Sequence, residues 1–188
     1  MKPPLLATLI CCSLYCCWSC NDGFQKKEIT TETVTQDSIV SEENIKAALP
    51  PSVPVITQDV QPQEIVNFAR TLIGVPYKYA STDPAVGFDC SGFITHVFNH
   101  FNITVPRSSV DFTNVGHEIN SASAAPGDLI LFTGTDSTIR VVGHMGIVTE
   151  NVDTLRFIHS TSGKQYGVTI TPLNRYYLGR FVKVIRIF

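Results

Sequence analysis

Cys90 is the residue of this sequence best placed to act as a nucleophile. It is the only cysteine after residue 20, and it stands in the stretch 87–94, which reads GFDCSGFI. Asp89 is a residue type that caps helix N-termini, and apolar residues then recur at helical spacing. A thiol in the first turn would lie among N–H groups that favour an anion, so we expect a lowered thiol pKa. The alternative is a small, buried, apolar cysteine.

A base for this thiol is expected from two histidines in the second half of the chain. Of the five histidines, only His144 and His159 lie on predicted strands, which flank a short polar loop. If Glu150 pairs with Leu155, Gly146 lies opposite His159, and His144 is its diagonal neighbour on the same face. Such neighbours are about 7–8 Å apart at Cα, within reach of two imidazoles, whereas a slip of one residue would separate them.

Cys90, His144 and His159 together have the residue types that thiol catalysis needs. An imidazole has to take the thiol proton, and a third polar group has to fix the tautomer of that imidazole. His144 fits the base and His159 the orienting group. For either histidine alone, a satisfied and partly buried imidazole is the alternative.

The same three side chains are also an acceptable ligand set for a metal ion. No close Cys-x-x-Cys or His-x-x-x-His spacing joins them, however. A copper site would want an axial methionine, and Met145, adjacent to His144, is expected on the opposite face of its strand. We therefore expect neither a metal nor another cofactor.

The elements that must position these residues follow from periodicity and from Pro and Gly signals. The spacing predicts a helix over 62–73, stopped by Gly74, a second from Asp89 to about residue 101, and a shorter third over 106–116. Alternating, β-branched segments predict five strands at 128–132, 144–149, 155–161, 168–173 and 181–188. Helices followed by strands indicate an α+β domain, with N-terminal helices packed on a C-terminal antiparallel sheet.

The first 61 residues are expected to lie outside this domain, which would span 62–188. Residues 1–20 contain an uncharged apolar run over 5–18, too short to span a bilayer comfortably, and indicate an export signal. Ser19-Cys20 resembles a bacterial lipoprotein signal, so Cys20 is the expected lipidation site, with ordinary cleavage near Ser19 as the alternative. Residues 21–61 are polar and acidic, which predicts a flexible tether.

This organisation predicts a bacterial envelope protein, anchored to a membrane if Cys20 is lipidated. The charge balance, 14 basic against 16 acidic residues, speaks against a nucleic-acid partner.

Over residues 62–188 the sequence resembles the NlpC family of bacterial cell-wall endopeptidases, which are compact papain-like cysteine peptidases. Six short segments match in the family's order: GVPY at 74–77, FDCSGF at 88–93, VPRS at 105–108, PGDLILF at 126–132, GHMGIV at 143–148 and FIHS at 157–160. The resemblance implies that Cys90 is the nucleophile, His144 the base and His159 the third polar residue.

The resemblance also implies substrate contacts beside the nucleophile. Tyr77 matches a family tyrosine that could orient the substrate or the oxyanion. Asp89 and Ser91 flank the cysteine where family members can contact a substrate amino group. The sequence departs from the family pattern at 80–81, where Ala-Ser replaces a frequent Gly-Gly, and at 111–112, where a glutamine is frequent. These departures bear on substrate choice.

The family cleaves short peptides of peptidoglycan, usually at bonds between D-glutamate and a diamino acid or in cross-links. The resemblance therefore implies peptidoglycan peptides as partners, and we expect a monomer. An inactive wall-binding module and a papain-like acyltransferase remain open as alternatives. Loss of a triad residue would indicate the inactive module, and all three residues are present.

Overall fold

A computed structural model describes residues 52–188 of the chain. The predicted signal at 1–20, the lipidation site Cys20 and the tether up to residue 51 lie outside the described residues. Within 52–188, none of the helices combines the length and the apolar character needed to cross a membrane.

Two α-helices come first, close to where the sequence predicts them. Helix α2 (Pro62–Thr71) begins with Pro at its first position, and the Gln61 N–H donates to the Glu64 carboxylate at 2.9 Å. The chain leaves this helix through Gly74, whose φ of +91° favours glycine. Helix α3 (Cys90–His100) is capped by Asp89, as predicted.

The remaining structure is mainly one antiparallel sheet of six strands, in the order β3-β8-β4-β5-β6-β7. The five predicted strands are all present. The sequence missed the sixth, β3, because it is three residues long and pairs only with the distant β8. The strands are β3 (His117–Ile119), β4 (Leu129–Thr133), β5 (Val142–Asn151), β6 (Leu155–Thr161), β7 (Gly167–Pro172) and β8 (Phe181–Arg186).

Several short elements were not predicted. A small hairpin precedes Cys90, and a short helix, α4, lies between β7 and β8. The predicted third α-helix is instead a 3₁₀ helix, which begins three residues later than expected. These elements are β1 (Thr82–Asp83), β2 (Gly87–Phe88), η1 (Ser109–Asn114), η2 (Ser121–Ser123) and α4 (Arg175–Arg180).

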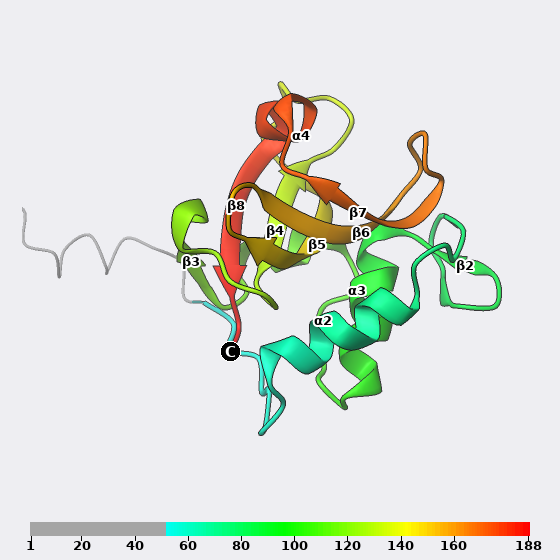
Figure 1. Ribbon diagram of the computed structural model, residues 1–188, viewed down its shortest axis with the longest axis vertical. Helices are drawn as coiled ribbons and strands as arrows, with labels where there is room; N and C mark the ends of the chain where they lie inside the picture. Colours follow the sequence, from blue (N-terminus) through cyan, green and yellow to red (C-terminus); the bar gives the residue numbers. More distant parts are fainter. Residues whose placement is uncertain (1–51) are drawn as a thin grey trace, which may run out of the picture. The chain divides into compact units, whose positions relative to one another are not determined.

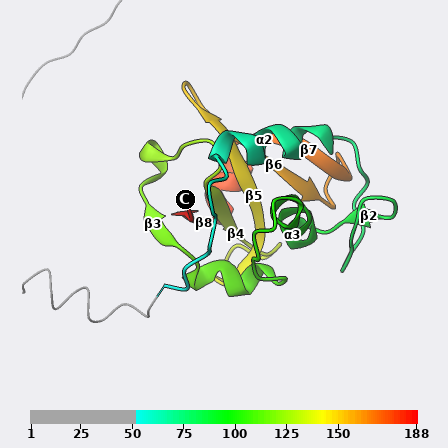
Figure 2. The same cartoon turned by 90° about the horizontal axis from the view of Figure 1, so that it is seen from below.

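The sheet separates two hydrophobic cores. Helices α2 and α3 lie against one face of the sheet (Figures 1 and 2), whereas Tyr177 of α4 packs into the core on the other face. The larger core joins the helices to side chains such as Met145 and Ile147, whereas the smaller one includes Phe132, Phe157 and Tyr177. Met145 therefore points away from the face that carries His144, as the alternation of the strand predicts. The fold is α+β, with helices packed on a mainly antiparallel sheet.

Ordered contacts begin before residue 62, where the sequence placed the start of the domain. Val53 pairs with Val115: its N–H donates to the Asn114 carbonyl at 2.7 Å, and its carbonyl accepts from the Gly116 N–H at 3.1 Å. Val55 and Val60 pack against the larger core. Apolar residues in this otherwise polar segment account for the difference.

Candidate active site

Cys90 is the first residue of α3, and an ion pair holds the start of this helix. The Asp89 carboxylate accepts from the Gly92 N–H at 2.5 Å and from two nitrogens of Arg107 at 3.1 and 2.7 Å. Asp89 is buried, so this bidentate contact offsets a charge that would otherwise be costly. The Ser91 hydroxyl, also buried, accepts from Arg107 at 3.0 Å. Arg107 lies in the VPRS segment matched above, but its ion pair with Asp89 was not predicted from the sequence.

The loop that carries Tyr77 is held against the same helix start by backbone contacts. Tyr77 forms an isolated β-bridge with Phe88, and the Phe88 N–H donates to the Pro76 carbonyl at 3.0 Å. Two glycines permit this approach: a Cβ on Gly87 would lie 2.5 Å from the Pro76 carbonyl oxygen, and a Cβ on Gly92 would lie 2.1 Å from that of Ser81. These contacts place the Tyr77 backbone beside the helix start, and Tyr77 and Cys90 line the same cavities.

His144 and His159 lie on adjacent strands and contact each other directly. Nε2 of His144 is 2.8 Å from Nδ1 of His159, and both side chains are buried. Strand β5 pairs Ile147 with Ile158 of β6, which puts Gly146 opposite His159 as the sequence predicts. An added Cβ at Gly146 would be only 3.2 Å from the Cβ of His159, so the glycine leaves room for the ring.

The predicted pairing at the hairpin end is wrong by one residue. Glu150 pairs with Arg156 rather than Leu155, and Asn151 takes the place opposite Leu155. The register shifts between Val148 and Glu150, because an irregularity there absorbs one residue. The shift lies beyond the histidines, so it leaves their alignment unchanged.

Thr171 of β7 extends the histidine pair into a chain of three groups. Nε2 of His159 is 2.9 Å from the Thr171 hydroxyl oxygen. If Nδ1 of His144 is to accept a proton, Nε2 of His144 must carry hydrogen and donate to His159. Nε2 of His159 then donates to Thr171. The sequence analysis missed Thr171, although the alternation of Thr169 and Thr171 on one face of a predicted strand was a usable signal.

Aromatic rings surround the two imidazoles and exclude water from them. Tyr177 packs against both, with ring centroids 6.2 Å from His144 and 5.4 Å from His159, and Phe157 lies 4.8 Å from His159. Burial is the main cause that lowers the pKa of His144 well below its ordinary value. Burial, reinforced by the charge of Arg180, lowers the pKa of His159 to about 3. Both imidazoles are therefore neutral near pH 7.

The expectation of a lowered thiol pKa is wrong. Burial, and secondly the negative charge of Asp89, raise the pKa of Cys90 above its ordinary value of 9.0. Backbone N–H groups at the helix start favour the thiolate but do not outweigh these effects. The thiol donates instead to the Gly143 carbonyl, at 3.9 Å from sulfur to oxygen. Near neutral pH the resting pair is a thiol and a neutral imidazole.

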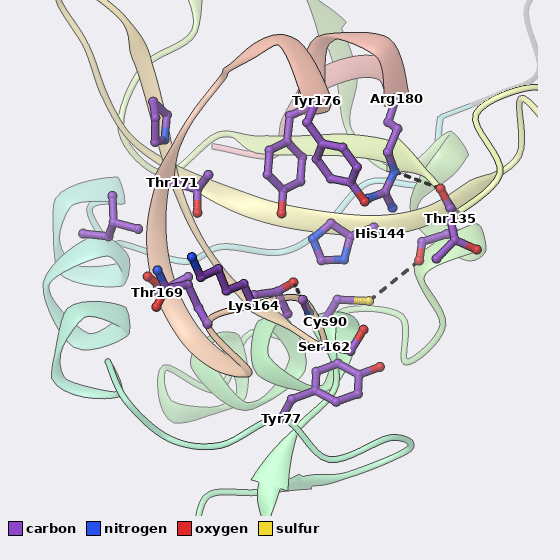
Figure 3. A pocket seen from close by; sticks show the side chains of 18 residues that line it. Tyr77, Cys90, Thr135, His144, Ser162, Lys164, Thr169, Thr171, Tyr176 and Arg180 are labelled. Carbon is purple, nitrogen blue, oxygen red and sulfur yellow. Dashed lines mark hydrogen bonds between the residues drawn. The ribbon is translucent and has the colours of Figure 1, made fainter.

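Two cavities flank the thiol and share Tyr77, Cys90 and Gly143 in their walls. The first, of about 680 Å³, also contains His144 and the residues around it (Figure 3). The second contains Asp89, Ser91 and Arg107. Burial raises the pKa of Tyr77, with the charge of Cys90 as the second cause, so its phenol remains a hydrogen-bond donor. All predicted site residues except Cys20, which lies outside the described residues, therefore border one of the two cavities or the histidine pair.

The metal alternative has little geometric support in this arrangement. In the described part of the chain, no group of three or more His, Cys, Asp and Glu side chains could hold a metal ion. Nε2 of His144 and Nδ1 of His159 face each other at hydrogen-bond distance, so these two nitrogens do not point at a common third atom.

This chain is similar to known proteins in sequence and in fold. Residues 74–186 match the sequence model of the NlpC/P60 family. The gamma-DL-glutamyl hydrolase of Bacillus subtilis is 31% identical over 141 residues, covering 72% of this chain and 33% of that protein. LytE of the same organism, a probable peptidoglycan endopeptidase, is 37% identical over 114 residues, covering 61% of this chain and 30% of that protein.

Comparison with solved structures leads to the same family. An NlpC/P60 family protein from Bacillus cereus has a TM-score of 0.61 to this chain at 29% identity, covering 70% of this chain and 41% of that one. The chain spans about a third of the length of the two Bacillus subtilis relatives.

The raised pKa of Cys90 predicts slow alkylation near neutral pH. The rate of Cys90 modification by iodoacetamide, followed by peptide mass spectrometry, should rise through a midpoint above pH 9.0. Asp89→Asn keeps a capping side chain but removes the charge, so its midpoint should fall. A wild-type rate that reaches its plateau below about pH 8 would contradict this assignment.

The lowered pKa of His159 predicts a loss of stability in acid. The unfolded chain takes up this proton near pH 6.5, whereas the folded protein does so only at about 3. The stability contributed by the neutral ring is therefore complete above pH 6.5 and is lost as the pH falls toward 3. His159→Gln does not titrate, so its melting temperature should fall less steeply over this range than that of wild type. The exposed His117→Gln serves as control, and equal slopes in all three proteins would refute the assignment.

Proposed function

Because the chain belongs to the NlpC/P60 family, we propose that residues 62–188 form a cysteine endopeptidase that hydrolyses peptide bonds of bacterial peptidoglycan. The observation that carries the proposal is the 2.8 Å contact between His159 and His144, because His144 lines the same cavity as Cys90. The names of the Bacillus subtilis relatives support the substrate class, since one is a gamma-DL-glutamyl hydrolase and another a probable peptidoglycan endopeptidase.

In the proposed mechanism, His144 takes the thiol proton during attack rather than before it. Nδ1 of His144 accepts this proton as the Cys90 sulfur bonds to the substrate carbonyl carbon. His159 accepts a hydrogen bond from Nε2 of His144 and so keeps the imidazole in the required tautomer. Thr171 is a positioning residue, whose hydroxyl accepts from Nε2 of His159 and holds that ring in place.

The negative charge that develops on the carbonyl oxygen needs a donor beside the thiol. The Tyr77 phenol supplies one, and the backbone N–H groups at the start of α3 supply others. His144 then gives its proton to the leaving amine, which departs and leaves a thioester on Cys90. Water, deprotonated by His144, hydrolyses the thioester and restores the thiol.

The two cavities then divide the substrate between them. The leaving amine has to lie beside His144, so the part of the peptide that departs occupies the first cavity. The acyl part lies toward the second cavity, near Asp89 and Ser91. Because both oxygens of Asp89 are already bonded to Gly92 and Arg107, we assign this carboxylate chiefly to holding Cys90 in place.

We further propose that the protein works in the bacterial envelope, exported by residues 1–20 and anchored through a lipid on Cys20. The apolar run and the Ser19-Cys20 junction support this location, as does a wall substrate. Peptidoglycan peptides would be its partners, and the reaction scheme uses no metal or other cofactor.

Digestion of purified sacculi tests the proposed activity. Wild-type protein should release stem-peptide fragments detectable by mass spectrometry, whereas Cys90→Ala and His144→Gln should release none. His159→Gln should keep part of the activity, because an amide can still accept the hydrogen bond of His144. Thr171→Val should lose about ten-fold in kcat with little change in KM, as expected for one lost positioning hydrogen bond.

His117→Gln is the matched control, because this exposed histidine lies on β3 and borders neither cavity. It should digest sacculi at the wild-type rate. Normal digestion by Cys90→Ala would overturn the peptidase proposal.

A further inference from the structure

The first cavity carries positive charge and no negative charge. Its lining includes Lys164 and Arg180, and it contains no Asp or Glu among the described residues. Lys164 is exposed on the loop between β6 and β7, whereas Arg180 is only 8% exposed at the end of α4. Figure 3 shows both side chains among those that surround the cavity, with His144 between them in this view.

Arg180 is held by neutral groups alone. Its Nε donates to the Gly134 carbonyl at 2.9 Å, Nη2 to the Thr133 carbonyl at 2.9 Å and Nη1 to the Tyr176 hydroxyl at 2.6 Å. Its guanidinium carbon also lies 5.0 Å from the centre of the Tyr176 ring. No carboxylate of residues 52–188 forms an ion pair with it, although four other basic side chains have such partners.

In this environment Arg180 has a positive charge that no carboxylate of residues 52–188 balances, and it has N–H groups that remain free to donate. A guanidinium stays protonated at any physiological pH, and a buried charge without a counter-ion is costly. Three of its five N–H groups are used by the bonds above, which leaves one on each terminal nitrogen. An anion entering the cavity would supply the counter-ion that the described residues lack.

The charge of Arg180 also works against the reaction unless an anion balances it. It is one of the causes that lower the pKa of both His144 and His159. A base that must become imidazolium during attack is weakened by a nearby cation. A negative group bound to Arg180 would remove that penalty at the moment when the substrate is in place.

We propose that the first cavity is a subsite for a carboxylate on the leaving-amine part of the peptide, bound by Arg180 and assisted by Lys164. This inference rests on the proposed function, which places the leaving amine beside His144 and therefore in this cavity. Paired guanidinium N–H groups match the planar, two-oxygen shape of a carboxylate. In a γ-D-glutamyl-diamino acid peptide that ends at the diamino acid, the amine that departs carries such a group.

Two peptides that differ only in this group give the direct test. The probes are γ-D-glutamyl-L-lysine with the lysine carboxyl either free or converted to the carboxamide, each acylated at the glutamyl amine. The full-length protein should cleave the carboxylate form with a kcat/KM about ten- to a hundredfold higher than the amide form, since a charge-assisted contact is lost in the amide. Equal kcat/KM values for the two forms would overturn the proposal while leaving the peptidase activity intact.

Single-residue variants test which side chain causes the preference for the carboxylate form. Arg180→Met should abolish the preference, so that kcat/KM for the carboxylate form is no higher than that for the amide form. Lys164→Met should give a smaller loss of the same kind. Arg175→Met is the matched control, because it removes the same charge from an exposed position on α4 that does not line the cavity. If Arg175→Met loses the preference for the carboxylate form as Arg180→Met does, the preference depends on the overall positive charge rather than on Arg180. That result would contradict the proposal.

Two further measurements keep the test decisive. If Arg180→Met melts below the assay temperature, Arg180→Lys, which keeps the charge but not the paired donors, takes its place and should lose part of the selectivity. Equilibrium binding of both probes to Cys90→Ala separates this inference from the activity. Preferential binding of the carboxylate form would support the subsite even if no peptide were cleaved. Equal binding would refute it.

Discussion

The hydrogen bond between His144 and His159 is the interaction on which the site depends. It forms inside a shell of aromatic side chains that includes Tyr177, and this shell keeps both rings neutral. A neutral imidazole can accept a proton, and its partner decides which nitrogen does so. The Thr171 hydroxyl in turn holds the His159 ring through its contact with Nε2. The charge of Arg180 contributes to the low pKa of His144. A substrate carboxylate bound at Arg180 would offset this charge and make His144 a stronger base.

Correct strand register is the structural condition for that bond. Side chains alternate along a strand, so a slip of one residue between β5 and β6 would put the two histidines on opposite faces. Gly146 opposite His159 contributes as well, because a Cβ there would lie 2.7 Å from the Phe157 ring and 2.9 Å from the Ile158 carbonyl oxygen. The thiol reaches this face from a helix on the other layer. Its position depends on the ion pair between Asp89 and Arg107 and on the close approach of loop 76–81.

Structural features with a local sequence signal could be predicted, whereas features that depend on contacts between separate segments could not. Apolar periodicity predicted both long helices and five strands, and alternation placed His144 beside His159. The strand β3 and the ion pair of Arg107 depend on contacts between separate segments of the chain, which no local pattern reveals. The thiol pKa was mispredicted for the same reason: the helix start was visible in the sequence, but the burial that outweighs it was not.

The central claim, that a neutral His144 is held in one tautomer by His159, can be measured directly. Nitrogen-15 chemical shifts of the histidine side chains report which ring nitrogen carries hydrogen. At neutral pH, both His144 and His159 should be neutral and protonated at Nε2, with Nδ1 of His144 bare. An imidazolium at His144, or hydrogen on its Nδ1, would contradict the account.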